Sequence, residues 1–284
     1  MNLEALRDQQ REEWTLCAGG WRDYRANFAL PSAPITDRML DLLKLARGEH
    51  VLDLACGNGN PTFAAAEAVG PAGRVLGLDL TAAMVDEGAA WAERHGVSNV
   101  EFRVIPDETR LGVAPGSFDA ATCRAGLQYM PDRDGAARAV FEALRPGGRF
   151  VAMTLGAPDR CMPFMLTNGI VSRHVQLPKL GTDTPGPVGL STVEQLEAVL
   201  RDAGFVDLVS DRFVAPIFEA PDPAAAWRLF VDTAGPFMKL FASLSDEQRR
   251  AMDDDAHRTF AAAFPDGPVR PTGEALVVCG VKPS

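Results

Sequence analysis

The feature that most constrains the fold is an alternation of short apolar runs with helical stretches between residues 50 and 155. The apolar runs are strand-length and nearly continuous, which is typical of strands buried in a parallel sheet. Parallel strands need crossover connections, so the alternation predicts an α/β fold with helices on both faces of the sheet. The expected strands cover 50–55, 74–79, 100–105, 118–123 and 150–155, and the expected helices cover 61–69, 81–95 and 132–144.

The rest of the chain adds helices around this unit and two later strands. We expect a turn at 145–148, where Pro146 and Gly147 occupy the central positions. Strands are expected over 205–214 and 275–281, and helical segments over 193–203, 223–244 and 246–264. The predicted organisation is a helical cap at 1–47, a ligand-binding core at 48–156, an irregular or partly helical cap insertion at 157–190, and the remainder of the core at 191–284 with a two-helix insertion at about 221–264.

Charge and cysteine content exclude several classes of protein. The 284 residues include 38 acidic and 28 basic side chains, a net charge of −10 that disfavours a nucleic-acid partner. Five scattered cysteines without a C-x-x-C pair suit a reducing compartment and predict neither a disulfide framework nor a metal site. Neither a secretory leader nor a membrane span is expected, so the sequence predicts a cytoplasmic protein.

A glycine loop after the first expected strand carries most of the functional signal. Gly57 and Gly59 would let a ligand approach the backbone at a strand-to-helix turn. The dinucleotide fingerprint requires a third glycine where this chain has Thr62, which argues against a nicotinamide cofactor. Asp53 precedes the loop, where a pyrophosphate would gain nothing from a carboxylate but an ammonium group would.

Two further groups of residues follow the second and third expected strands. Asp79 can accept both hydroxyls of a ribose, and Leu80 and Met84 could cover an adenine face. Pro106, Asp107 and Glu108 follow the third strand, and Asp107 could accept from the exocyclic amine of adenine. Loop solvation or helix capping would explain each carboxylate alone. Carboxylates at the ends of three successive strands favour a nucleoside cofactor.

Four motifs occur in order along the chain: Asp53-x-x-Cys56-Gly57-x-Gly59, Gly77-Leu78-Asp79-Leu80 with Met84, Gly116-Ser117-Phe118-Asp119, and Leu144-Arg145-Pro146-Gly147-Gly148-Arg149-Phe150. With these motifs the chain resembles the class I S-adenosylmethionine-dependent methyltransferases. Its closest resemblance is to the branch of ubiquinone and menaquinone biosynthesis and of small-molecule methylation in secondary metabolism. The resemblance is strong over His50 to Leu155 and weaker in the opening helices and the closing strand.

The resemblance implies a Rossmann-like sheet of seven mostly parallel strands, with the last strand antiparallel and beside the fifth. It also implies S-adenosylmethionine as the cofactor, its methionine moiety near Gly57 and Gly59, its ribose on Asp79 and its adenine amine on Asp107. The chain departs from the family pattern at Asn60 and at Pro106. The residues expected to hold the cofactor are Asp53, Ala55, Cys56, Gly57, Asn58, Gly59, Asp79, Leu80, Met84, Pro106, Asp107, Glu108 and Cys123.

Candidates for the acceptor side follow the fourth expected strand. Arg124 could anchor a substrate anion or form a salt bridge to the opening helices, and Gln128 and Tyr129 would lie nearby. His174 is a candidate general base, with a solvated loop histidine as the alternative reading. Six aromatic residues could form the core of the cap or line an apolar acceptor pocket: Trp14, Trp21, Tyr24, Phe164, Trp227 and Phe237.

Three functions remain open at this point. The first is methyl transfer to a small organic acceptor, with oxygen favoured over nitrogen or carbon. The donor is already activated, so a base is required only when the acceptor arrives protonated. The second is a non-methylating step, such as cyclisation or elimination, on the same fold. The third is a nicotinamide dehydrogenase, which Asp53 and Thr62 oppose. A homodimer is possible.

Overall fold

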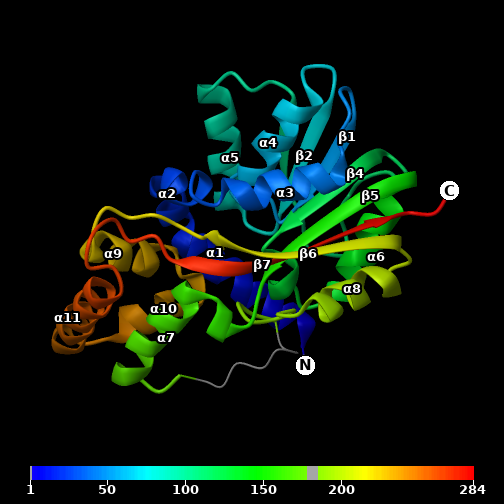
Figure 1. Cartoon of the computed structure of the whole chain (residues 1–284). Helices are drawn as coiled ribbons and strands as arrows, with labels where there is room; N and C mark the ends of the chain where they lie inside the picture. Colours follow the sequence, from blue (N-terminus) through cyan, green and yellow to red (C-terminus); the bar gives the residue numbers. More distant parts are fainter. Residues whose placement is uncertain (1, 178–184) are drawn as a thin grey trace.

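The computed structural model describes residues 2–177 and 185–284 and contains the expected parallel sheet (Figure 1). Within this described part, seven strands form one sheet in the order β3-β2-β1-β4-β5-β7-β6. Strand β7 is antiparallel to both β5 and β6, whereas β1 to β5 are mutually parallel. The fold class is confirmed. The strands are β1 His50–Leu54, β2 Arg74–Asp79, β3 Val100–Val104, β4 Phe118–Arg124, β5 Leu144–Leu155, β6 Val206–Pro216 and β7 Thr272–Val281.

Helices cover both faces of the sheet because each has one apolar face to bury. On one face lie α3 (Ala33–Leu43), α4 (Asn60–Val69) and α5 (Ala82–Arg94). On the other lie α6 (Arg133–Ala143) and α8 (Val193–Asp202). Local signals set the helix starts: α4 has a proline in its first turn, and α8 begins with a capping box.

A second group of helices gathers at the carboxyl ends of the strands and forms the cap (Figure 1). Its apolar core includes Trp227 and Phe260, and Phe218 comes from the segment between β6 and α9. Helix α1 runs between this core and the loops of the sheet. The cap helices are α1 Leu3–Asp23, α2 Arg25–Ala29, α7 Met162–His174, α9 Pro223–Thr233, α10 Gly235–Ser243 and α11 Asp246–Ala263, and the short 3₁₀ turns are η1 Leu127–Tyr129 and η2 Pro158–Arg160.

Two local expectations were wrong. The turn expected at 145–148 lies inside β5, because the strand pairs with β4 on both sides of it, Leu144 opposite Phe118 and Arg149 opposite Ala120. The extra residues form a bulge in which Gly147 has a φ of 75°. The single helical segment expected at 223–244 is broken at Ala234, since Pro236 lacks an amide proton and disfavours helical backbone before it.

No helix among residues 2–177 and 185–284 is both long enough and apolar enough to cross a lipid bilayer.

Candidate functional site

A cavity of about 370 Å³ lies where the parallel strands end and the cap begins. The loops after β1, β2, β3 and β4 form its floor, and α1, α7, α9 and α10 contribute to its walls. Ligands of open α/β sheets bind outside the carboxyl ends of the strands, so this position is the expected one for a ligand. The cavity has a polar part over β1 to β3 and an aromatic part under the cap.

The loop after β1 adopts an unusual backbone. Ala55, Gly57 and Gly59 all have left-handed φ angles, of 57°, 53° and 99°. A Cβ on Gly57 would meet open space, whereas one on Gly59 would come within 2.5 Å of Phe63. Ala55 and Gly57 line the cavity, and Gly59 does not. The two glycines therefore have different roles. Gly57 leaves space between the loop and the cavity, and Gly59 allows α4 to pack closely against the loop.

Asp79 joins this loop to the end of β2. Its carboxylate accepts hydrogen bonds of 2.9 Å from the backbone amides of Gly57 and Thr81. Burial raises the pKa of this carboxyl, and the amides oppose that shift. Asp79 lines the cavity, and a carboxylate retains further lone pairs for two ribose hydroxyls. Leu80, Met84 and Ile105 line the same part and give apolar surface for a purine. These residues fit a nucleoside.

Asp53 does not lie on the cavity wall. It is fully buried, and its two oxygens accept from the Thr62 and Thr122 hydroxyls at 2.6 and 2.7 Å. Burial raises its pKa to about 6. Thr62, the residue that breaks the dinucleotide pattern, is therefore a partner of Asp53. The structure shows no direct route from this carboxylate to an ammonium group in the cavity, so its role as a cofactor contact stays a prediction.

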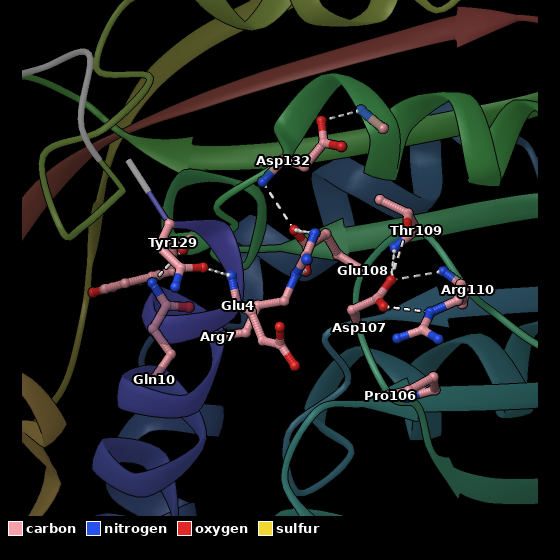
Figure 2. Close-up of polar contacts among 12 residues, drawn as sticks. Glu4, Arg7, Gln10, Pro106, Asp107, Glu108, Thr109, Arg110, Tyr129 and Asp132 are labelled. Atoms are coloured by element: carbon pink, nitrogen blue, oxygen red, sulfur yellow. Dashed lines mark hydrogen bonds and ion pairs between the residues drawn. The ribbon is translucent and has the colours of Figure 1, made fainter.

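The loop after β3 differs from the sequence expectation (Figure 2). The Asp107 carboxylate accepts from Thr109 and Arg110 and does not line the cavity. Burial raises its pKa, but these hydrogen bonds outweigh burial and lower it to about 2. Glu108 does line the cavity, and Arg7 of α1 donates to both of its oxygens, at 2.8 and 2.9 Å. Pro106 contributes only its carbonyl, which accepts from Arg11.

The residues expected on the acceptor side lie together in the cavity wall. Arg124, Gln128 and Tyr129 line its aromatic part, at the end of β4 and in the following 3₁₀ turn. Arg124 donates to the Ser32 hydroxyl at 2.6 Å, and no ion pair of this guanidinium occurs among the described residues. The alternative of a salt bridge to the opening helices is therefore wrong. Burial lowers the pKa of Arg124 to about 10 and raises that of Tyr129.

Two other candidates lie away from the cavity. His174 ends α7, and its Nε2 lies 3.1 Å from a carboxylate oxygen of Asp255 in α11. It is not among the residues that line the cavity, which argues against its assignment as general base. Its place is a helix end, where it holds two cap helices together. Cys123 is fully buried in the core near the end of β4, the middle strand of the sheet, and is not among the residues that line the cavity. Burial raises the pKa of its thiol to about 12.

Sequence reasoning missed Arg25, which lines the cavity from α2. Its guanidinium donates to the Asn58 carbonyl at 2.6 Å and lies 5.3 Å from the Trp91 ring and 5.6 Å from the Phe63 ring. This hydrogen bond connects α2 to the loop after β1. The Asn58 side chain in turn donates to the Trp21 carbonyl of α1. No motif or spacing marks Arg25, because its partners come from three separate segments.

Of the six aromatic residues that were expected either in the cap core or in an acceptor pocket, some take each position. Trp14, Trp21, Phe164 and Phe237 line the cavity, whereas Tyr24 and Trp227 pack within the cap core.

Comparisons with known proteins agree with this geometry. A family model described as a methyltransferase domain matches residues 45–178. The chain is 32% identical over 184 residues to the demethylmenaquinone methyltransferase of Lactococcus lactis, covering 60% of this chain and 69% of the relative. It is 28% identical to the 27-O-demethylrifamycin SV methyltransferase of Amycolatopsis mediterranei, covering 71% of each. The crystal structure of the YcgJ protein of Bacillus subtilis shares the fold, with a TM-score of 0.55, 20% identity and coverage of 88% and 98%.

The sheet order and the cavity at the carboxyl ends of the strands define a Rossmann-like α/β protein with a ligand site at the strand ends. The chain belongs to the class I S-adenosylmethionine-dependent methyltransferase family.

Proposed function

We propose that this enzyme transfers a methyl group to an oxygen atom of a small, largely apolar acceptor that the cap covers. The observation that carries the proposal is the cavity itself. It continues from Asp79 at the nucleoside part to Phe164, Phe230 and Phe237 in the cap. An acceptor held among these rings would lie beside the end of the nucleoside part, at Arg124.

The cofactor occupies the polar part in this proposal. Asp79 would hold the ribose, Leu80, Met84 and Ile105 the adenine, and the open side of Gly57 the methionine moiety. Bound S-adenosylmethionine supplies a methyl group on a sulfonium, which needs no further activation. The chain's own residues supply orientation and exclusion of water. Arg7 and Gln10 of α1 close one side by bonding to Glu108 and to the Tyr129 carbonyl (Figure 2).

The name of one relative supports oxygen as the acceptor atom. The relative from Amycolatopsis mediterranei is a methyltransferase of 27-O-demethylrifamycin SV. The relative from Lactococcus lactis is a demethylmenaquinone methyltransferase, a name that indicates a quinone and specifies no oxygen. Biosynthesis of a quinone or of a secondary metabolite is therefore the proposed setting.

Mass spectrometry of reaction products tests the proposal. The purified enzyme is incubated with S-adenosylmethionine and a panel of polycyclic phenols, enols and acids. Methyl transfer adds one methylene unit to the acceptor and yields S-adenosylhomocysteine in equal amount. A product of unchanged mass would instead indicate the non-methylating alternative, such as cyclisation. Methylation restricted to nitrogen or carbon would contradict the choice of oxygen.

A further inference from the structure

Among the described residues, the cavity wall offers no imidazole, and its carboxylates already accept hydrogen bonds from other groups of the chain. Among the described lining residues the carboxylates are Asp79 and Glu108, and no imidazole is present. Asp79 accepts from two loop amides, and Glu108 accepts from Arg7 and from the Asp132 amide. Burial favours the neutral phenol of Tyr129 by raising its pKa, and raises that of the Cys161 thiol to about 11. An acceptor that is already deprotonated when it binds needs no general base from this wall.

The same wall presents an incompletely partnered cation. Only one hydrogen bond of Arg124 occurs within the described residues, from Nη2 to Ser32, and its buried Nε has no hydrogen-bond partner. The charge of Asp53 raises the pKa of this guanidinium, although the two groups form no ion pair. Buried donors are normally paired, and an unpaired charged donor is costly. A ligand oxyanion would supply the missing acceptor.

Gln128 follows this cation by four residues in the sequence and lines the same cavity. Its side chain is only 1% exposed, and its Oε1 has no hydrogen-bond partner. An amide can present either its oxygen or its N–H groups. The backbone that carries both residues is tightly constrained. Ala125 has a φ of 53°, and a Cβ on Gly126 would lie 2.4 Å from the Ala55 Cβ. Left-handed non-glycine residues concentrate at ligand sites because the surrounding structure must hold them.

We infer that the acceptor is a flat, apolar acid that binds and reacts as its oxyanion, with that oxygen held by Arg124 and Gln128. This inference rests on the proposed function and adds the charge state and shape of the substrate. We infer the flat, apolar shape of the acceptor from the aromatic side chains that line the cavity. These are Trp14, Phe28, Phe164, Phe218, Phe230 and Phe237. The acceptor oxyanion forms the new C–O bond while the C–S bond breaks and its electron pair passes to sulfur, so no proton moves and both charges are neutralised.

Binding of matched probes to the enzyme saturated with S-adenosylhomocysteine tests this inference. The probes are 2-naphthoate, the hydroxynaphthoquinone lawsone, whose enol is acidic, and the neutral 2-naphthylmethanol. We expect at least one anion to bind tenfold or more tightly than the alcohol, a difference of about 1.4 kcal/mol. Preference for 2-naphthoate would assign a carboxylic acid, and preference for lawsone an enol or phenol. Equal affinity for alcohol and anions, or binding of no probe, would overturn the inference.

Variants assign the preference to the proposed groups. Arg124→Met should lower anion affinity at least tenfold without changing alcohol affinity, and Arg124→Lys should restore part of the loss. Gln128→Glu should weaken anion binding by charge repulsion. The control is Arg258→Gln, at an exposed position on α11, which should behave as wild type. An anion preference unchanged in Arg124→Met would refute the assignment.

Titration of wild type and each variant with S-adenosylhomocysteine shows whether the variant is folded. It also distinguishes a failure of this inference from a failure of the proposed function. If the wild-type enzyme does not bind S-adenosylhomocysteine, the proposed function fails. If Arg124→Met loses S-adenosylhomocysteine affinity instead of anion affinity, the guanidinium holds the cofactor's carboxylate, and only the inference fails.

Discussion

At the scale of single residues, the site depends on charges and backbone angles that cost stability. Ala55 and Ala125 end the neighbouring strands β1 and β4 in left-handed conformations, at φ of 57° and 53°. Such conformations cost about 1–3 kcal/mol each and persist only where their surroundings enforce them. Both residues line the cavity. The backbone strain is therefore concentrated at the floor of the site.

Asp53 makes stability depend on pH in a direction that can be predicted. Burial raises its pKa from 3.8 to about 6, so ionisation in the folded state is penalised. The penalty is absent below pH 3.8, grows as pH rises through about 6 and is constant above that. Asp53→Asn removes the penalty. Urea unfolding should show equal stability near pH 4 and a more stable variant at pH 7, by up to about 3 kcal/mol.

The control for this prediction is Asp211→Asn on β6, where the carboxylate pairs with Arg38 in a half-exposed position. Its difference from wild type should stay small and change little over the same pH range. A difference for Asp53→Asn that is independent of pH, or that favours the wild type at pH 7, would contradict the assigned pKa.

At the scale of elements, α1 connects the cap to the core. It bonds to the loop after β3 through Arg7 and Arg11 and to the cap through Trp21, whose ring N–H donates to the Thr233 carbonyl. At Gly20 it packs directly on α9, since a Cβ there would lie 2.1 Å from the Asp232 carbonyl oxygen. Helix α1 therefore fixes the distance between cap and sheet.

Two adjacent glycines of α1 give a matched test of this packing. Gly20→Ala would force α1 from α9, and we expect a loss of about 1–3 kcal/mol in the free energy of unfolding. Gly19→Ala would meet only the flexible end of Arg22 at 3.8 Å, so helix propensity should stabilise the protein by about 0.5–1 kcal/mol. Chemical denaturation measures both. Similar effects of the two substitutions would refute the close contact.

Two ion pairs of α1 differ in their exposure to solvent. Arg7 and Glu108 are 16% and 5% exposed, whereas Lys239 and Glu12 are 54% and 57% exposed. Arg7→Met leaves a buried carboxylate short of partners, and we expect a loss of about 1–3 kcal/mol with faster hydrogen exchange in α1. Lys239→Met, the exposed counterpart, should cost less than about 1 kcal/mol. The reverse order would contradict the role of Arg7.

The sequence predicted elements better than contacts. The strands from β1 to β4 follow from their apolar runs, and Asp79 follows from its place at a strand end. The bulge in β5 was not predictable because Pro146 and Gly147 give the same local signal in a turn and in a bulge. Asp107 was expected to face the cofactor, but Thr109 and Arg110 donate hydrogen bonds to its carboxylate within the same loop. Arg25 depends on contacts with distant segments, which no local pattern encodes.

At the scale of the whole molecule, sheet and cap form one site that neither contains alone. The sheet contributes Asp79 and the loop after β1, and the cap contributes the aromatic part of the cavity. In the proposed function, the sheet would bind the cofactor and the acceptor oxygen, and the cap would cover the apolar part of the acceptor. The homodimer, the division into domains and the absence of a nucleic-acid partner stay predictions.

The most direct test of this account is calorimetric titration of the protein with S-adenosylhomocysteine, comparing wild type, Asp79→Asn and Asp211→Asn, a control substitution on β6. Wild type and control should bind one molecule per chain with equal affinity. Asp79→Asn should bind at least tenfold more weakly, because hydrogen bonds to a charged group contribute about 1.5–3 kcal/mol. Absence of saturable binding to the wild type, or undiminished binding to Asp79→Asn, would contradict the assignment of this cavity as the cofactor site.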